Sequence, residues 1–496
     1  MEQYPYKYED DPWPDQDGDP GAVGYSLEPD TNDDEVDPDD YLPAGAPPLH
    51  SHGSPPEPRQ APLSQNQLAD NVAGHLSGRL LYDPAIHEWH APNGIAWGIC
   101  TDVIVEREIE AALKRERNGF TYSYLAGVTK FLRSRLAVKS WEDSRDYLPM
   151  ANGILNLKTH KLESERGRYF NWQLPHKYTE RTECPVIHGW LHQVTQGNAD
   201  VINLLHAWMY AVLTGRADLQ RYIELIGPGG TGKSTFINLC THLVGEGNTV
   251  TTDLRNLEQS RFETAALYGK RLAVITDSSA YGGDVDILKA ITGQDLIRRE
   301  RKNKDPSGFI FRGMLMVASN QPIQSRDYTS GLSRRRIPVR FGYRVTEADK
   351  ARYPNGIETA MAAEVPALIS RLLAMGPGLL DHIRQPGQVI AQFKFRAELE
   401  TNPLMSWLHE TVVTTGDDGS ETASSEMYKS YREYCSESGH NPVSTTKFAG
   451  LLVDITTSRG IATTAKRSTV QRYFAGLRLR ESTDDLKPLL FDHNPA

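Results

Sequence analysis

A glycine-rich segment carries the strongest chemical signal in the sequence. Residues 227–234, GPGGTGKS, fit the phosphate-binding pattern G-x-x-x-x-G-K-[ST]. The apolar stretch Tyr222–Ile226 precedes the segment and Thr235–Leu243 follows it, which predicts a strand, a loop and a helix in that order. Glycines let backbone amides approach phosphate oxygens, and the first turn of the helix adds free N–H groups and the positive end of its dipole.

This pattern predicts ATP and Mg²⁺ as cofactors and gives individual side chains a role. Lys233 would neutralise the β- and γ-phosphates, and the Ser234 hydroxyl would bind Mg²⁺. The expected nucleotide contacts are Gly227, Pro228, Gly229, Gly230, Thr231, Gly232, Lys233, Ser234 and Thr235.

Two further apolar stretches end in polar residues suited to hydrolysis. KRLAVITD ends at Asp277, the candidate second ligand of Mg²⁺ and activator of the attacking water; an ordinary aspartate at a strand end is the alternative. MLMVAS leads to Asn320, whose amide could orient water beside the γ-phosphate; a simple turn before Pro322 is the alternative. The order of the three strands and their terminal residues favours the catalytic interpretation.

A dense run of cations lies between these two stretches. Residues 298–304 contain five basic residues in seven and precede an apolar stretch at 309–311, so we expect a β-hairpin with a cationic tip. Arg301, Lys302 and Lys304 are the candidate contacts to the phosphates of a single strand. A solvated charge run is the alternative.

Arginines suited to phosphoryl transfer follow Asn320. Residues 333–338, SRRRIP, predict a strand on which Arg335 would reach the γ-phosphate of a neighbouring subunit. Arg334 and Arg336 are the reserves for this role, on the opposite face of that strand. A charged surface strand is the alternative.

The C-terminal region is basic as well. Residues 445–480 hold seven basic residues and one acidic residue. We expect a helix, a basic second helix and a hairpin, the arrangement of a winged-helix DNA binder, with Lys447, Lys466 and Arg467 as candidate DNA contacts.

Charge and composition differ between the N-terminal segment and the rest of this chain of 496 residues. Residues 1–50 carry fifteen Asp or Glu and one Lys, so the net charge of −10 hides a body at +4 over residues 51–496. We expect a disordered acidic tail over 1–68, a mixed α+β domain over 69–215, a parallel-sheet α/β domain over 216–400 and the DNA-binding domain over 401–496.

The four cysteines form no CxxC pair, and no signal or membrane segment is expected, so the predicted location is the cytoplasm. His87 and His90, in HEWH, are interpreted as ordinary histidines rather than as a zinc site.

These motifs together resemble the phage- and plasmid-type primase-helicases, superfamily III helicases of the AAA+ class that include the poxvirus primase-helicase. The resemblance rests on YLPMANGILNLKTHKL, GPGGTGKST, GKRLAVITD, LKAITGQDLIRRERKNKDPSGFIF, MLMVASNQP and LSRRRIPVRF, in that order. It implies an AAA+-type core with Asn320 as sensor and Arg335 as arginine finger. Where that family has Glu, often followed by another acid, this chain has Asp277 and Ser278, and Asp284 or Asp286 could assist.

The resemblance implies an ATP-dependent DNA helicase of a mobile element that acts on single-stranded and forked DNA as a hexameric ring. Because only the acidic tail precedes residue 69, we expect a helicase without its own primase and a separate primase or replication protein as partner. The alternative is an initiator that binds DNA, uses ATP as an assembly switch and does not unwind. A kinase or a terminase fits less well, because of the basic segments and because no nuclease carboxylate cluster follows residue 345.

Overall fold

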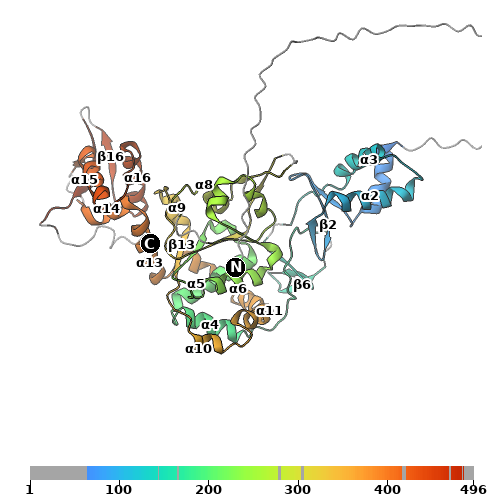
Figure 1. The fold of residues 1–496 in the computed structure, drawn as a ribbon, viewed down its shortest axis with the longest axis horizontal. Helices are drawn as coiled ribbons and strands as arrows, with labels where there is room; N and C mark the ends of the chain where they lie inside the picture. The colour runs from blue at the N-terminus through green and yellow to red at the C-terminus, as the bar shows by residue number, and fades with distance from the viewer. Residues whose placement is uncertain are drawn as a thin grey trace, which may run out of the picture. The chain divides into compact units, whose positions relative to one another are not determined.

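The computed structural model of the protein describes residues 64–142, 145–164, 167–276, 281–302, 306–415, 421–467, 471–482 and 484. The predictions for residues 1–63, for Asp277 and for Lys304 therefore lie outside the described residues. Figure 1 shows the order of the elements along the chain by colour. Within the described ranges no single helix is long and apolar enough to cross a membrane; Ile357–Met375 and Pro377–Thr401, bent by 84°, meet the same criteria as a pair.

Residues 64–138 form an N-terminal module with its own core. Its elements are α1 (Gln65–Leu76), β1 (Leu81–Asp83), β2 (Glu88–Asn93), β3 (Ala96–Ile99), α2 (Asp102–Glu116) and α3 (Tyr122–Arg135). The three strands pair antiparallel in the order β1-β2-β3. Helix α2 is amphipathic: Val105, Ile109 and Leu113 recur with helical period and are buried.

The expected end of the acidic tail at residue 68 is wrong by about one helical turn. Ser64 caps α1, and its side chain and that of Gln67 form a reciprocal capping box. Leu68 is only 2% exposed and packs in the core of the N-terminal module. Residues 64–68 therefore belong to the folded part of the chain.

A second antiparallel sheet and two helices lead to the central sheet. Their bounds are β4 (Tyr147–Met150), β5 (Gly153–Asn156), β6 (Lys161–Glu163), α4 (Pro185–Val194), α5 (Ala199–Thr214) and η1 (Ala217–Leu219). Helix α5 is buried along most of its length, and its apolar residues share one core with the central sheet. The hydrophobic core therefore does not divide at residue 215.

The central sheet is five-stranded and entirely parallel, in the order β13-β7-β12-β9-β8. The strands are β7 (Tyr222–Ile226), β8 (Thr249–Thr252), β9 (Leu272–Ile275), β12 (Met314–Ser319) and β13 (Arg336–Arg340). The predicted strands at 222–226, 270–277 and 314–319 are confirmed over their described residues, and the predicted helix after the glycines is α6 (Lys233–Val244).

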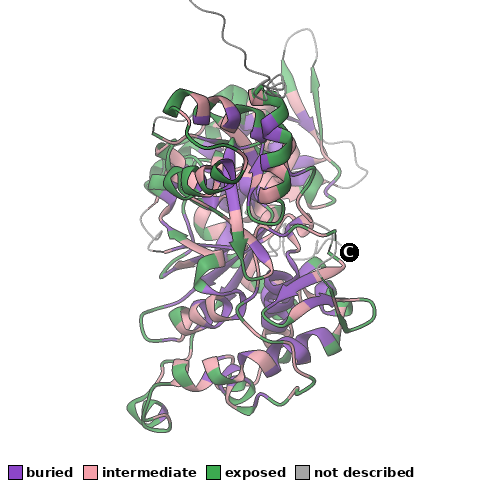
Figure 2. Ribbon diagram, turned by 90° about the vertical axis from the view of Figure 1, so that its right-hand side faces the viewer, coloured by how far each residue is buried: buried purple, intermediate pink, exposed green. Residues whose placement is uncertain are grey.

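Both faces of the central sheet are covered, which explains why its strands are apolar throughout. Successive residues of a strand point to opposite faces. Ile223 of β7 packs in a core with α5, α6 and α11 (Ile357–Met375), whereas Tyr222 packs with α7 (Leu254–Gln259) and α8 (Asp286–Gly293). Buried residues concentrate on these strands and the helices that cover them (Figure 2).

Shorter elements lie between the strands of the sheet or lead from it to the C-terminal part of the chain. They are η2 (Glu246–Asn248), η3 (Glu263–Leu267), β10 (Leu296–Arg299), β11 (Ser307–Ile310), α9 (Ser330–Arg335), α10 (Glu347–Ala351), η4 (Pro377–Leu380), α12 (Asp381–Arg384) and α13 (Gln388–Thr401). Strands β10 and β11 pair antiparallel, which confirms the predicted hairpin arms.

Residues 403–415, 421–467, 471–482 and 484 form a C-terminal module around one aromatic core. Its elements are α14 (Pro403–Thr411), β14 (Val412–Thr414), β15 (Glu421–Ala423), α15 (Ser424–Glu437), α16 (Thr445–Ser458), β16 (Thr464–Arg467), β17 (Arg472–Ala475) and β18 (Leu477–Leu479). The predicted helices and hairpin are present. The expectation of a basic second helix is wrong: α16 holds one cation, Lys447, and one acid, Asp454, while Lys466, Arg467 and Arg472 lie on the β16–β17 hairpin.

Candidate nucleotide site and nucleic-acid contacts

The glycine-rich segment forms a tight loop between β7 and α6. At Gly227 an added Cβ would lie 2.0 Å from the backbone oxygen of Phe341, so no side chain fits there. Gly230 and Gly232 have φ values of +76° and +94°, the region that favours glycine. Gly232 is also the N-cap of α6, so the loop leads directly into the free amides of the first helical turn. The loop therefore has the backbone geometry of an anion-binding site.

Part of the predicted nucleotide contact set stabilises the loop itself. The buried Thr231 donates its hydroxyl to the Pro228 carbonyl at 2.9 Å, and the Val345 amide donates to the Gly230 carbonyl at 2.9 Å. Pro228, Gly229 and Gly230 are exposed. The Thr231 side chain thus fixes the curvature of the loop, and its hydroxyl is directed inward rather than toward a ligand.

Lys233 and Asn320 meet at this loop. The Lys233 ammonium donates to the carbonyls of Gly227 at 2.5 Å and Pro228 at 2.9 Å, and its Nζ lies 3.5 Å from Oδ1 of Asn320. Burial lowers the pKa of Lys233. The structure therefore brings together two residues that lie 87 positions apart in the sequence.

Strand order explains this meeting. Strand β12 is the direct parallel neighbour of β7, and Ser319 pairs with Ile226. Gly227 and Asn320, the next residues of the two strands, therefore leave the sheet at the same carboxyl edge, where open α/β sheets bind their ligands. The Gly227 amide also donates to the Ser319 carbonyl at 3.3 Å.

The predicted magnesium ligands are only partly described. Ser234 is exposed in the first turn of α6, where its hydroxyl suits a hard cation that prefers oxygen ligands. Strand β9 ends at Ile275, which pairs with Val317 of β12, so the chain enters the segment of Asp277 from this same edge. Across the ranges that the structure describes, no group of three or more His, Cys, Asp or Glu could hold a metal ion. The hydroxyl of Thr235, a predicted nucleotide contact, donates to Glu358 of α11 at 3.4 Å.

Arg335 lies at the other edge of the sheet. It is the last residue of α9, and the next residue, Arg336, pairs with Tyr222 at the amino end of β7. Five strand residues at about 3.3 Å each place Arg335 roughly 16 Å from the phosphate loop along β7. Its guanidinium donates to the Gly331 carbonyl at 2.8 Å. Arg335 therefore does not reach the phosphate loop of its own chain.

Two expectations about the arginine segment are wrong. Residues 330–335 are helical, so Arg334 and Arg335 are not on a strand and strand alternation does not orient them. Arg336 is buried and forms an ion pair with Glu224, whose side chain is fully buried in β7. Because of this pairing, Arg336 is not an alternative to Arg335 as the arginine that contacts the γ-phosphate. Sequence reasoning missed Glu224, although a charged residue inside the apolar stretch YIELI was a visible signal.

The cations of the β10–β11 hairpin differ in their exposure to solvent. Arg299, which is not among the predicted DNA contacts, is buried, with its guanidinium 4.9 Å from the ring centroid of Tyr268. Arg301 forms an ion pair with Glu88 of β2, in the N-terminal module. Lys302 is exposed. Within the described part of this hairpin, Lys302 is thus the predicted contact most accessible to a phosphate.

The predicted cations of the C-terminal module lie on the surface. Lys447 is exposed on α16, and Lys466 and Arg467 are exposed on β16. Lys466 pairs across the hairpin with Tyr473, with its ammonium 6.0 Å from the ring centroid, and its Nζ lies 3.3 Å from Glu421. An aromatic ring beside exposed cations suits contacts to bases and phosphates.

Comparison with known proteins adds two family matches to this geometry. Residues 69–196 match the D5 N-terminal-like family. This match supports the resemblance to the phage- and plasmid-type primase-helicases. Residues 225–336, which contain the phosphate loop, Asn320 and Arg335, match a family of unknown function, DUF5906.

Solved structures of one protein resemble the chain over most of its length. The apo A form of the NrS-1 C-terminal region aligns with 11% identity and a TM-score of 0.47, covering 84% of this chain and 99% of that chain. A second apo structure of the same region aligns with 11% identity and a TM-score of 0.45, covering 83% and 98%.

Proposed function

We propose that the protein is an ATP-dependent DNA helicase that serves the replication of a phage, plasmid or other mobile element. The observation that carries this proposal is the distance of 3.5 Å between Lys233 Nζ and Asn320 Oδ1 at the carboxyl edge of the parallel sheet. A cation inside a glycine loop and an amide beside it are the groups that ATP hydrolysis requires at the β- and γ-phosphates. The D5 N-terminal-like match supports the replicative context.

The loop and its neighbours have separate roles in this proposal. The loop amides and Lys233 bind the phosphates, and Asn320 orients water and responds to the γ-phosphate. Ser234 and Asp277 hold Mg²⁺, which neutralises phosphate charge when bound. The fit to ATP is supported by the positive φ at Gly230 and Gly232, because a loop of this conformation favours bare backbone, whose amides can approach phosphate oxygens.

The position of Arg335 supports a shared site in an AAA+-type ring, which we propose is a hexamer. Arg335 lies at the amino edge of the sheet, whereas Lys233 lies at the carboxyl edge. Arg335 of one subunit would therefore complete the site of the next subunit rather than its own. Such an arginine stabilises the charge that develops on the γ-phosphoryl group.

In this proposal the β10–β11 hairpin transmits force to the DNA, and the C-terminal module recruits the DNA. Lys302 near the hairpin tip grips a single strand, while Lys447, Lys466 and Arg467 bind duplex or forked DNA in a winged-helix-like manner.

Strand displacement on a forked DNA with a labelled strand tests the proposal. We expect ATP-dependent release of the labelled strand. ATP hydrolysis that single-stranded DNA stimulates, without any release, would instead favour an initiator that assembles with ATP and does not unwind. If the protein neither hydrolyses ATP nor releases the labelled strand, the proposed function is contradicted.

A further inference from the structure

Helix α9 lies in the segment between Asn320 and Arg335, two residues of the proposed site. It follows the loop that begins at Asn320, and it ends at Arg335. It is six residues long, so its own hydrogen bonds hold it only weakly. Contacts from outside the helix therefore determine where Arg335 lies.

The first of these contacts comes from the C-terminal module. The Asp454 carboxylate on α16 accepts hydrogen bonds from the backbone amide of Ser330 at 2.7 Å and from its hydroxyl at 2.8 Å. Thr329, the N-cap residue of α9, makes no side-chain capping bond. Asp454 thus supplies from a different module the cap that stabilises the first turn of α9.

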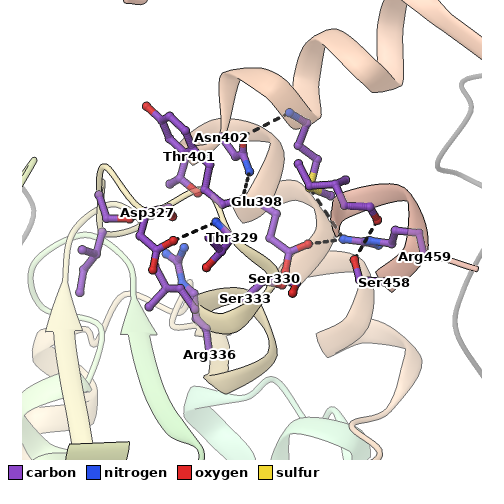
Figure 3. Close-up of a pocket in the computed structure, with 16 residues that line it drawn as sticks. Asp327, Thr329, Ser330, Ser333, Arg336, Glu398, Thr401, Asn402, Ser458 and Arg459 are labelled. Carbon is purple, nitrogen blue, oxygen red and sulfur yellow. Dashed lines mark hydrogen bonds and ion pairs between the residues drawn. The ribbon is translucent and has the colours of Figure 1, made fainter. Parts of the chain in front are cut away.

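The second contact comes from α13. Glu398 is only 5% exposed, and its two carboxylate oxygens accept from different modules: Ser333 of α9 donates to one, and Arg459 donates to the other. Arg459 is the C-cap residue of α16. Figure 3 shows Glu398 between Ser333 and Arg459. One buried carboxylate therefore joins α9 to the helix that carries Asp454.

Ser333, Glu398 and Arg459 line a pocket of about 50 Å³, whereas Asp454 lines a separate pocket of about 550 Å³. Binding sites for small ligands enclose roughly 300–1,000 Å³, so the pocket at Glu398 has room for water and not for a nucleotide. Its lining combines charged and polar groups from the loop after Asn320, from α13 and from α16. The region is therefore a joint between α9 and the C-terminal module.

We propose that Asp454 and Glu398 are positioning residues that couple the C-terminal module to Arg335. The inference rests on the proposed function, because it gives Arg335 a catalytic role. Strand β16, with Lys466 and Arg467, contacts α16. DNA bound at that strand would favour the orientation of α16 in which Asp454 and Arg459 hold α9, and so would favour the productive position of Arg335.

The test compares Asp454→Ala with Glu426→Ala, which removes a carboxylate from an exposed position of the same module. Asp454→Ala should lower ATP turnover at saturating forked DNA roughly tenfold, a loss within the range for a helix cap replaced by alanine. The KM for ATP should not change, whereas the affinity for forked DNA should fall, because DNA at β16 and the joint favour the same orientation of α16. Glu426→Ala should retain parental turnover.

A double variant separates positioning from an unrelated defect. Asp454→Ala combined with Arg335→Ala should be no slower than Arg335→Ala alone, because both changes remove the same contribution. If the two losses multiply, or if Asp454→Ala turns over like Glu426→Ala, the proposal is overturned. Should Asp454→Ala fold poorly, Ser333→Ala removes a donor to Glu398 while leaving Arg459 paired, and the same comparison of turnover rates is made with that variant.

Hydrogen exchange provides a readout that does not depend on hydrolysis. In Asp454→Ala the backbone amides of residues 329–335 should exchange faster, while those of β7 and β12 keep their rates. If the parent hydrolyses no ATP, the proposed function fails. Parental exchange rates across α9 in Asp454→Ala would independently overturn the joint itself.

Discussion

Glu224 and Arg336 form a buried ion pair inside the central sheet, where β7 and β13 run side by side. The same Glu224 carboxylate accepts from the backbone amide of Ile323 at 2.7 Å and from the Ser319 hydroxyl at 3.4 Å. One side chain thus connects the strand that enters the phosphate loop, the segment around Asn320 and the strand that follows Arg335.

Breaking this pair should destabilise the protein strongly. Arg336→Met leaves the Glu224 carboxylate buried without its cation, which costs about 3–5 kcal/mol. In urea unfolding the midpoint should fall sharply. Arg384→Met, which disrupts an exposed pair with Asp381, should change the free energy of unfolding by less than about 0.5 kcal/mol. Similar midpoints for the two variants would contradict the structural role of Arg336.

Arg335 should act on a neighbouring subunit. Arg335→Ala should lower ATP turnover on the order of 10³-fold while ATP binding persists, since the phosphate loop is intact. Mixing Arg335→Ala with Lys233→Ala should restore part of the activity, because some interfaces then contain both groups. Absence of restoration at every ratio, in oligomers shown to exchange subunits, would contradict a shared site.

Lys302 should bind a phosphate of single-stranded DNA. Lys302→Gln should lower the slope of log affinity against log salt by roughly 0.7, and unwinding should fall while DNA-free hydrolysis is retained. Lys114→Gln on α2, also at an exposed position, serves as the control and should not change the slope. Arg301→Gln should change it less than Lys302→Gln, because Arg301 is paired with Glu88. If the slope is the same in Lys302→Gln and in the parent, Lys302 is a solvated surface charge that does not contact DNA.

Acid should destabilise the core around His206. Burial, and secondarily the charge of Arg371, lowers the pKa of this histidine to about 4, against 6.5 for the ordinary side chain. Between these values the unfolded chain binds a proton that the folded chain does not, so stability is lost as the pH falls from about 6.5 to about 4, by up to roughly 3 kcal/mol. His206→Gln should reduce this slope in urea unfolding, whereas exposed His440→Gln should not. An unchanged slope in His206→Gln would contradict the assignment.

The sequence predicted the local elements better than the contacts between them. Hydrophobic periodicity and the glycine pattern located β7, α6 and β12, because those signals depend on neighbouring residues. That Asn320 lies beside Lys233 depends on strand order, which periodicity does not encode. The helix ending at Arg335 was missed because its stability comes from Asp454 and Glu398, partners more than 60 residues away in the sequence.

ATP hydrolysis by the full chain tests the central claim most directly. Turnover is measured with and without single-stranded DNA for the parent, for Lys233→Ala and for Lys350→Ala, which removes an exposed lysine paired with Glu347. We expect DNA-stimulated turnover in the parent and in Lys350→Ala. Lys233→Ala should abolish it without changing the fold, because the side-chain cation of the phosphate loop is gone. Near-parental turnover in Lys233→Ala, or no hydrolysis by the parent, would contradict the account.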